Sequence, residues 1–112
     1  MSNAPLREPT FLILTALAAR PQHGYGIQHD VEEISGGQVT LRAGTLYAAL
    51  DRLRVDGWVD VDREEVVDGR LRRYYRLTEP GAARLAAEVE RLRAHTRAAH
   101  NRLRTRLTGG TA

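Results

Sequence analysis

The sequence lacks cysteine and lysine altogether. Without cysteine the chain has no disulfide, no thiolate metal site and no cysteine nucleophile, and it suits a reducing compartment, so we expect the cytoplasm. Because lysine is absent, all 17 basic residues are arginine, and the arginine content alone says little about function. At 112 residues the chain has the length of one domain, which excludes a large multidomain enzyme.

Long apolar runs and enzyme motifs are missing too. The longest apolar run, 11–19, is interrupted by Thr15 and is far shorter than the roughly 20 residues of a membrane span. We also find no secretion signal, phosphate-binding loop, glycine elbow or HxxxH pattern. His29, Asp30 and Glu33 have metal-binding groups but are more typical of an ordinary surface. We therefore expect no enzyme, no metal and no cofactor.

Charge is divided unevenly along the chain, whose formal net charge is +3. Residues 1–56 carry five arginines and six acids, whereas residues 70–112 carry eleven arginines and three acids. The C-terminal part is therefore a candidate surface for an anionic partner.

Apolar residues recur at helical spacing in three consecutive short segments. We expect helices from about Thr10 to Arg20, from the end of a turn at 21–24 to Gly36-Gly37, and from about Arg42 to Asp56. Alternation from Trp58 to Asp62, a turn at Asp68-Gly69 and the segment 70–77 then predict a two-stranded β-hairpin.

A long helix is expected after the hairpin. Thr78-Glu79-Pro80 supplies a capping hydroxyl, an acid and a first-turn proline, and no helix breaker follows until Gly109-Gly110. The order predicts an α+β, mainly helical fold, a winged helix-turn-helix of three helices plus a β-hairpin wing with a long C-terminal helix. The expected divisions are an N-terminal extension (1–8), the winged helix-turn-helix domain (9–78), a C-terminal dimerisation helix (79–107) and a disordered tail (108–112).

The outer face of the third predicted helix suits a DNA groove. Thr45 and Tyr47 can hydrogen-bond to phosphates or bases, and the small Ala48 allows close approach to a base edge. Arg42 and Arg52 add positive charge. Structural alternatives are a half-buried packing role for Tyr47 and a surface ion pair for Arg52. Winged helices also serve as protein-interaction modules, so the fold alone does not fix the function.

Arginines gather at the predicted wing, with four in the seven residues from Arg70 to Arg76. We expect Arg70, nearest the turn, to contact DNA phosphates, with Arg72 and Arg73 beside it. The alternative is that these arginines neutralise the acids of the opposite strand, and some of them can do both.

The last predicted helix carries an apolar stripe in steps of four and three residues, flanked by arginines. A small domain has little room to cover so long a helix, so we favour a dimer seam over folding back onto its own core. A symmetric dimer presents two recognition helices to an inverted repeat. The stripe consists of Leu85, Val89, Leu92, Thr96, Ala99 and Leu103.

Five stretches in this order resemble the PadR family of bacterial transcriptional regulators, in particular its short members. They are PTFLIL (9–14), HGYGI (23–27), GTLYAALDRL (44–53), DGWV (56–59) and GRLRRYYRLT (69–78). The resemblance implies a homodimeric repressor that an inducer releases from an operator, often next to its own gene. It also implies that the C-terminal helix crosses the partner and packs on its N-terminal helix, which adds Phe11 and Leu14 to the dimer contacts.

By position, the resemblance implies DNA-binding roles for Tyr25, which opens the second helix, and for Gly44, Thr45, Tyr47 and Arg70. Relatives often carry Ser-Pro where this chain has Arg42-Ala43, which loses a capping hydroxyl and gains a candidate phosphate contact. Relatives that bind flat aromatic drugs stack them on a tryptophan of the last helix. The single tryptophan here, Trp58, follows the third helix, and we expect it to anchor the wing.

We therefore expect a sequence-specific DNA-binding regulator whose partners are double-stranded DNA, a second copy of the chain and an unidentified small-molecule effector. The alternative is a winged-helix protein-interaction module without specific DNA binding. A dimer gated by a metal or small molecule is an elaboration of the first hypothesis. Salt dependence distinguishes the two main hypotheses, because phosphate binding releases counterions and an apolar protein contact does not.

Overall fold

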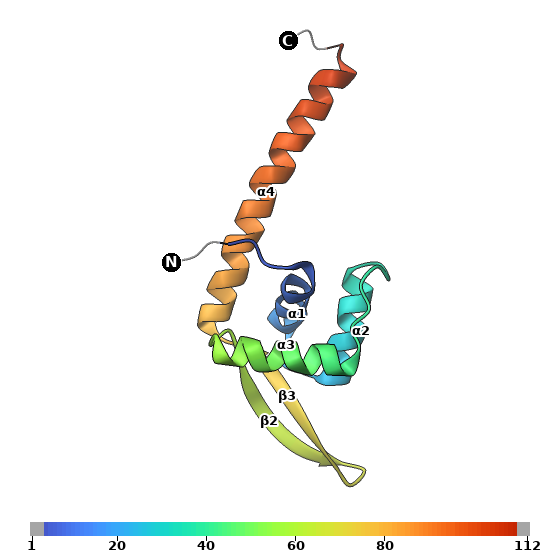
Figure 1. The fold of residues 1–112 in the computed structure, drawn as a ribbon, viewed down its shortest axis with the longest axis vertical. Coiled ribbons are helices and arrows are strands. Elements are labelled where there is room, and N and C mark those ends of the chain that lie inside the picture. Colours follow the sequence, from blue (N-terminus) through green and yellow to red (C-terminus); the bar gives the residue numbers. More distant parts are fainter. Residues whose placement is uncertain (1–3, 110–112) are drawn as a thin grey trace.

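The computed structural model describes residues 4–109, and within them three helices enclose a core from which a hairpin and a fourth helix project (Figure 1). The elements are α1 (Glu8–Ala19), β1 (Gln22–His23), α2 (Gly24–Ile34), α3 (Ala43–Val55), β2 (Val59–Val67), β3 (Arg70–Leu77) and α4 (Glu79–Leu107). The hairpin and α4 point to opposite ends of a molecule that measures 67 × 32 × 21 Å. The predicted α+β winged helix-turn-helix with a long C-terminal helix is confirmed.

The central helix α1 begins at Glu8, two residues before the predicted start, because Pro9 is tolerated in the first turn of a helix. Five of its residues are buried, including the consecutive Leu12, Ile13 and Leu14. They join Ile27 of α2 and apolar residues of α3 and the sheet in one core. Among the described residues, no helix is long and apolar enough to cross a membrane.

The sheet has one strand more than the sequence predicted. Residues 21–24 were expected to form only a turn, but Gln22 and His23 pair with Tyr75 and Tyr74 and give the strand order β1-β3-β2. Gln22 is buried, and its amide donates to the carbonyl of Ala16. This short strand fastens the base of the wing to the end of α1.

The wing itself turns at the predicted dipeptide. Asp68 and Gly69 have φ angles of 51° and 76°, which suit the tight turn of a two-residue hairpin. A bulge between Val61 and Arg63 shifts the register of β2 against β3 by one residue. Thr108 and Gly109, the first two residues of the predicted disordered tail, form a turn after α4. The rest of that tail, 110–112, lies outside the described residues.

The start of α4 rests on the turn after α3. The Thr78 side chain caps the helix, as predicted, by accepting a hydrogen bond from the N–H of Gly81 at 3.1 Å. The N–H of Thr78 donates to the carbonyl of Trp58, whose own N–H donates to Leu53 of α3. The Trp58 side chain packs against the core, in keeping with the anchoring role expected from the sequence.

Gly81→Ala is expected to destabilise the fold. A Cβ atom there would lie 2.1 Å from the carbonyl oxygen of Trp58, and backbone cannot move aside as a flexible side chain can. We expect a loss of about 1–3 kcal/mol in the free energy of unfolding, measured by denaturant titration. Gly44→Ala is the matched control, because it also lies in the first turn of a helix and its Cβ would meet no atom within 4 Å. An equal loss in both variants would contradict the proposed contact.

Candidate nucleic-acid interface

The helix α3 divides its side chains between the core and the surface. Leu46, Ala49, Leu50 and Leu53 are buried. The residues expected to face DNA are all exposed, namely Arg42, Gly44, Thr45, Tyr47, Ala48 and Arg52. Arg42 precedes the helix without a side-chain cap, so the first N–H groups of α3 are open to an acceptor from outside the chain.

Tyr47 combines exposure with a close contact to α2. It remains 44% exposed, yet a Cβ atom on Gly24 would lie 2.2 Å from its hydroxyl oxygen. With glycine at position 24 the ring lies against the backbone there, so α3 contacts the first residue of α2 through this side chain, and a Cβ at 24 would require the ring to shift. The packing alternative and the surface role considered for Tyr47 are thus compatible.

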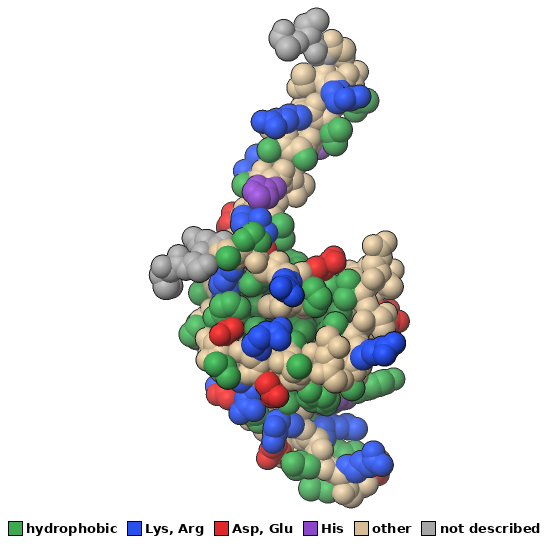
Figure 2. Space-filling model, viewed as in Figure 1, with side chains coloured by type: hydrophobic (Ala, Val, Ile, Leu, Met, Phe, Trp, Pro, Cys, Tyr) green, Lys and Arg blue, Asp and Glu red, His purple; other side chains and the backbone are tan. Residues whose placement is uncertain are grey.

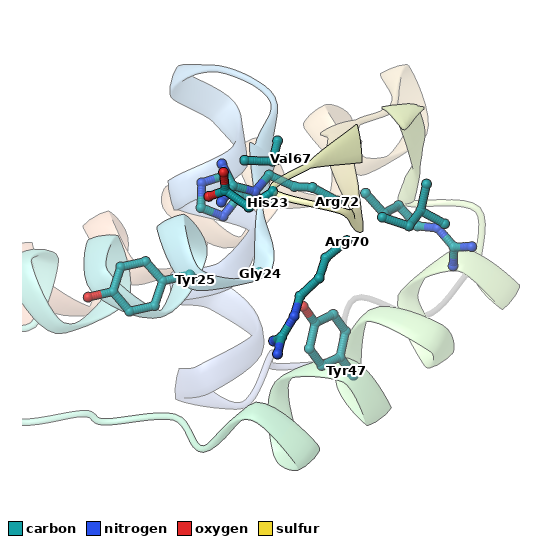
Figure 3. A pocket seen from close by; sticks show the side chains of 10 residues that line it. His23, Gly24, Tyr25, Tyr47, Val67, Arg70 and Arg72 are labelled. Carbon is teal, nitrogen blue, oxygen red and sulfur yellow. The ribbon is translucent and has the colours of Figure 1, made fainter. Parts of the chain in front are cut away.

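A groove of about 490 Å³ lies between the wing and the starts of α2 and α3 (Figure 3). In Figure 3, Arg70 extends from the wing into the same space as Tyr47, and Arg72 lies beside His23. Ten residues line it: His23, Gly24, Tyr25, Tyr47, Val67, Asp68, Arg70, Leu71, Arg72 and Arg73. The groove brings together the wing arginines, Tyr25 and Tyr47, which lie far apart in the sequence.

His23, which was not among the predicted site residues, connects the wing to α2. Its Nδ1 accepts a hydrogen bond from the N–H of Gly26 at 3.2 Å and so caps α2. Its ring meets that of Tyr74 edge-on, with 5.3 Å between centroids, and stacks on that of the exposed Tyr25. Burial, and then the positive charge of Arg72, lower the pKa of His23. The neutral form, which can accept from Gly26, is therefore favoured. Its position just before the first residue of a helix was the available sequence clue.

The wing arginines differ in whether they have partners. Arg73 pairs with Glu64 at 2.8 Å and Arg76 with Asp60 at 3.5 Å, as the strand-neutralising alternative predicted. Among the described residues, Arg70 and Arg72 form no ion pair. Their guanidinium groups are therefore available to an outside anion, whereas that of Arg73 is engaged.

Other acids of β2 form ion pairs or hydrogen bonds within the wing. Arg63 lies 3.2 Å from Asp62 and 3.7 Å from Glu65, and its guanidinium carbon stands 3.8 Å from the centre of the Tyr74 ring. The Tyr74 hydroxyl donates to Glu65 at 2.7 Å. Arginines gather over the wing and again along α4 in the surface view (Figure 2).

The expected dimer residues fall into three groups. Phe11, Val89, Leu92 and Thr96 line an apolar hollow of about 480 Å³ between α1 and α4. Ala99 and Leu103 are exposed further along α4, and Leu85 packs against the core of its own chain. Leu14 must be corrected, because its side chain is 0% exposed within that core and has no surface for a partner.

The part of the chain that the structure describes contains no group of three histidine, cysteine or acidic side chains placed to hold a metal ion. The candidate set around His29 is not assembled. Asp30, one of its members, instead accepts a hydrogen bond from Gln22 at 3.0 Å.

Comparison with known proteins agrees with these features. Residues 13–87 match the model of the transcriptional regulator PadR-like family. Transcriptional regulator Rv3488 of Mycobacterium tuberculosis is 44% identical over 57 residues, which cover 51% of this chain and 52% of that protein.

Two solved structures share the fold at low identity. A PadR family transcription regulator from Clostridium difficile R20291 superposes with a TM-score of 0.70 at 23% identity, covering 87% of this chain and 99% of that one. Bacillus subtilis PadR, solved in complex with operator DNA, gives a TM-score of 0.63 at 23% identity, covering 71% and 46%. The match thus spans about half of the Mycobacterium and Bacillus proteins.

Acid is expected to destabilise the contact between the wing and α2 through His23. Its pKa is lower in the folded chain than the ordinary 6.5, so the stability it contributes is complete above that value and is lost as the pH falls below it. We expect the free energy of unfolding to fall more between about pH 7 and pH 5 in the unaltered protein than in His23→Asn, which keeps a capping oxygen. Parallel pH curves for the two proteins would show that His23 plays no such role.

Proposed function

Because the chain belongs to the PadR-like family of transcriptional regulators, we propose that it is a homodimeric repressor that binds an inverted-repeat operator in double-stranded DNA. The observation that carries the proposal is the groove in which Arg70 and Arg72, free of ion pairs within the described residues, face the starts of α2 and α3. A cationic groove in the protein beside an exposed helix suits double-stranded DNA, because phosphates line both sides of the DNA groove that the helix would enter.

In this proposal α3 enters the major groove. Thr45 and Ala48 project from its exposed face and suit base edges, because they are small enough for the helix backbone to approach closely. Arg42, Gly44 and the open N–H groups of the first turn suit a phosphate oxygen. Tyr25, Tyr47 and Arg52 flank this face as further backbone contacts.

The wing supplies the sequence-independent part of the affinity. Arg70 and Arg72 are assigned to phosphates, and Arg73 has a secondary role because Glu64 already neutralises it. The protein-interaction module considered as an alternative has no corresponding use for unpaired arginines at a projecting tip, and the family of the chain favours DNA.

The second copy is proposed to cover the apolar stripe of α4. Leu92 and Leu103 are 37% and 59% exposed, and the stripe continues the hollow that begins at Phe11. Arginines flank it, and Glu90 is the last acid of the chain. Two such helices side by side along their whole length would repel each other, whereas residues 1–56, whose five arginines and six acids nearly balance, offer a partner surface without that repulsion. This supports a crossing of α4 onto the partner's N-terminal helices.

The cytoplasm is the proposed compartment, and an effector that prefers one arrangement of the two subunits would release the operator. The first test is fluorescence anisotropy with DNA from immediately upstream of the chain's own gene, beside a scrambled duplex, at two salt concentrations. Tight, salt-sensitive binding that prefers the native duplex supports a specific regulator. Absence of binding even at low salt would overturn the proposal.

Arg70→Ala is expected to weaken binding to specific and scrambled duplexes alike, by about tenfold near 0.1 M salt, because one charge-assisted phosphate contact is lost. The slope of log K against log salt should become shallower by about one unit. Arg106→Ala, which removes the same charge at the far end of α4, is the control and should leave both quantities nearly unchanged. Equal effects of the two substitutions would remove the wing from the interface.

Leu92→Glu is expected to convert the dimer to a monomer, because it places a charge in the apolar hollow. Light scattering during size-exclusion chromatography measures the mass, and affinity for a duplex with two half-sites should fall at least tenfold. Ala94→Glu adds the same charge on the same helix outside the stripe and should keep the dimer. A dimer that persists in Leu92→Glu would disprove the assigned seam.

A further inference from the structure

The helix α4 is buried against the rest of the molecule at two points, with Leu85 packed on the core between them. Of its 29 residues only Gly81 and Glu88 are buried. They are seven positions apart, which is about 10 Å along a helix axis. Two separated points of attachment fix the direction of a rod, whereas one would leave it free to tilt.

The first point is the backbone junction at Gly81, which lies against the carbonyl of Trp58. The second is a side-chain cluster around Glu88, which is 2% exposed. Its Oε2 accepts a hydrogen bond from the backbone N–H of Leu6 at 3.1 Å, across 82 positions of sequence. Arg91 donates to both carboxylate oxygens, at 2.6 and 2.9 Å.

Arg84 extends the cluster to two other parts of the chain. It lies 4.0 Å from Glu88, donates to the carbonyl of Ala4, and places its guanidinium 5.5 Å from the centre of the Trp58 ring. The segment before α1, the first turns of α4 and the turn between α3 and the wing therefore meet at three charged side chains. We name Glu88, Arg84, Arg91 and the N–H of Leu6 the α4 clamp.

Glu88 remains ionised at neutral pH. The hydrogen bonds from Arg91 lower its pKa to about 2, and the Leu6 N–H acts in the same direction against the opposing effect of burial. Apolar side chains would cover this surface without the cost of removing a charge from water. A buried carboxylate with directional partners instead restricts the junction to one geometry.

We propose that Glu88 is a positioning residue that, through the Leu6 N–H, sets the angle at which α4 leaves the DNA-binding domain and thereby the distance between the two recognition helices of the dimer. The link to DNA spacing rests on the proposed function, whereas the clamp itself does not.

The length of α4 makes this angle consequential. From Glu88 to Leu107 the helix extends about 29 Å, so a swing of about 10° displaces its end by about 5 Å. One base-pair step is about 3.4 Å. A small change at the clamp therefore corresponds to a change of more than one base pair in half-site spacing.

Spin-label distances test the clamp without DNA. Since the chain has no cysteine, His29→Cys on α2 and Asn101→Cys on α4 provide two unique labelling sites. Dilution with unlabelled protein removes distances between subunits. Leu6→Pro deletes the N–H that Glu88 accepts, and Leu6→Ala, which deletes only the side chain, is its matched control.

We expect Leu6→Pro and Glu88→Gln to shift or broaden the distance distribution by several ångströms, and Leu6→Ala to leave it unchanged. Thermal unfolding verifies that each variant is folded. Distributions that are unchanged in both Leu6→Pro and Glu88→Gln overturn the clamp. An equal change in Leu6→Ala overturns the assignment to the N–H.

Spacing preference tests the consequence for DNA. A series of duplexes carries two half-sites whose separation increases by one base pair at a time. The affinity of the unaltered protein should have one sharp maximum in this series. Glu88→Gln should keep its affinity for a single half-site within about twofold. The ratio of its affinity for the best spacing to its affinity for the neighbouring spacings should fall at least threefold. An unchanged ratio despite altered label distances overturns the link to spacing. If the unaltered protein binds no duplex, the proposed function and the link to spacing both fail, and the label distances still decide on the clamp.

Discussion

The backbone of Trp58 is the constraint on which the arrangement of this molecule depends. Its N–H donates to Leu53 at the end of α3, and its carbonyl accepts from Thr78 at the start of α4. Gly81 passes so close to this carbonyl that no side chain fits between them. The end of α3, the root of the wing and the start of α4 thus all bond to or contact the backbone of one residue, Trp58. This junction fixes where α4 begins relative to α3 and the wing, and the contacts around Glu88 then set the direction in which α4 leaves it.

Some wing arginines are paired within the chain and others are left unpaired at its surface. Acids of β2 neutralise two of the wing arginines, Arg73 and Arg76, and the bulge between Val61 and Arg63 brings the second of them opposite its acid. If the strand register next to the turn continued along the whole hairpin, Asp60 would pair with Leu77. The bulge shifts the register by one residue and places Asp60 opposite Arg76. Arg70 lies opposite the apolar Val67. Arg72 lies opposite Glu65, which is engaged by Tyr74 and Arg63, so Arg70 and Arg72 carry the unpaired charge of the tip. A chain with a net charge of only +3 can therefore present a strongly cationic groove.

Local patterns in the sequence predicted most of the fold, because caps, tight turns and helical periodicity are properties of neighbouring residues. The cap at Thr78 and the wing turn are examples. The strand β1 was missed because two residues carry no period, and the burial of Glu88 because it depends on a backbone group 82 positions away. For the site, exposure on α3 followed from its apolar spacing. Which wing arginines are paired depends on the strand register, and so did not.

Position in the fold also separates what can move from what cannot. Leu14 and its neighbours fill the core beneath α3, and a close-packed core resists deformation. Phe11, on the same helix, forms one wall of the hollow that α4 completes. A molecule inserted in that hollow would push α4 away from Phe11, because the wall formed by α1 does not yield. The displacement would fall on α4, which is attached through the junction at Gly81, the packing of Leu85 and the polar clamp at Glu88. Of these three, the clamp is made of side-chain hydrogen bonds that can be exchanged for water, so it is the point at which the direction of α4 can change.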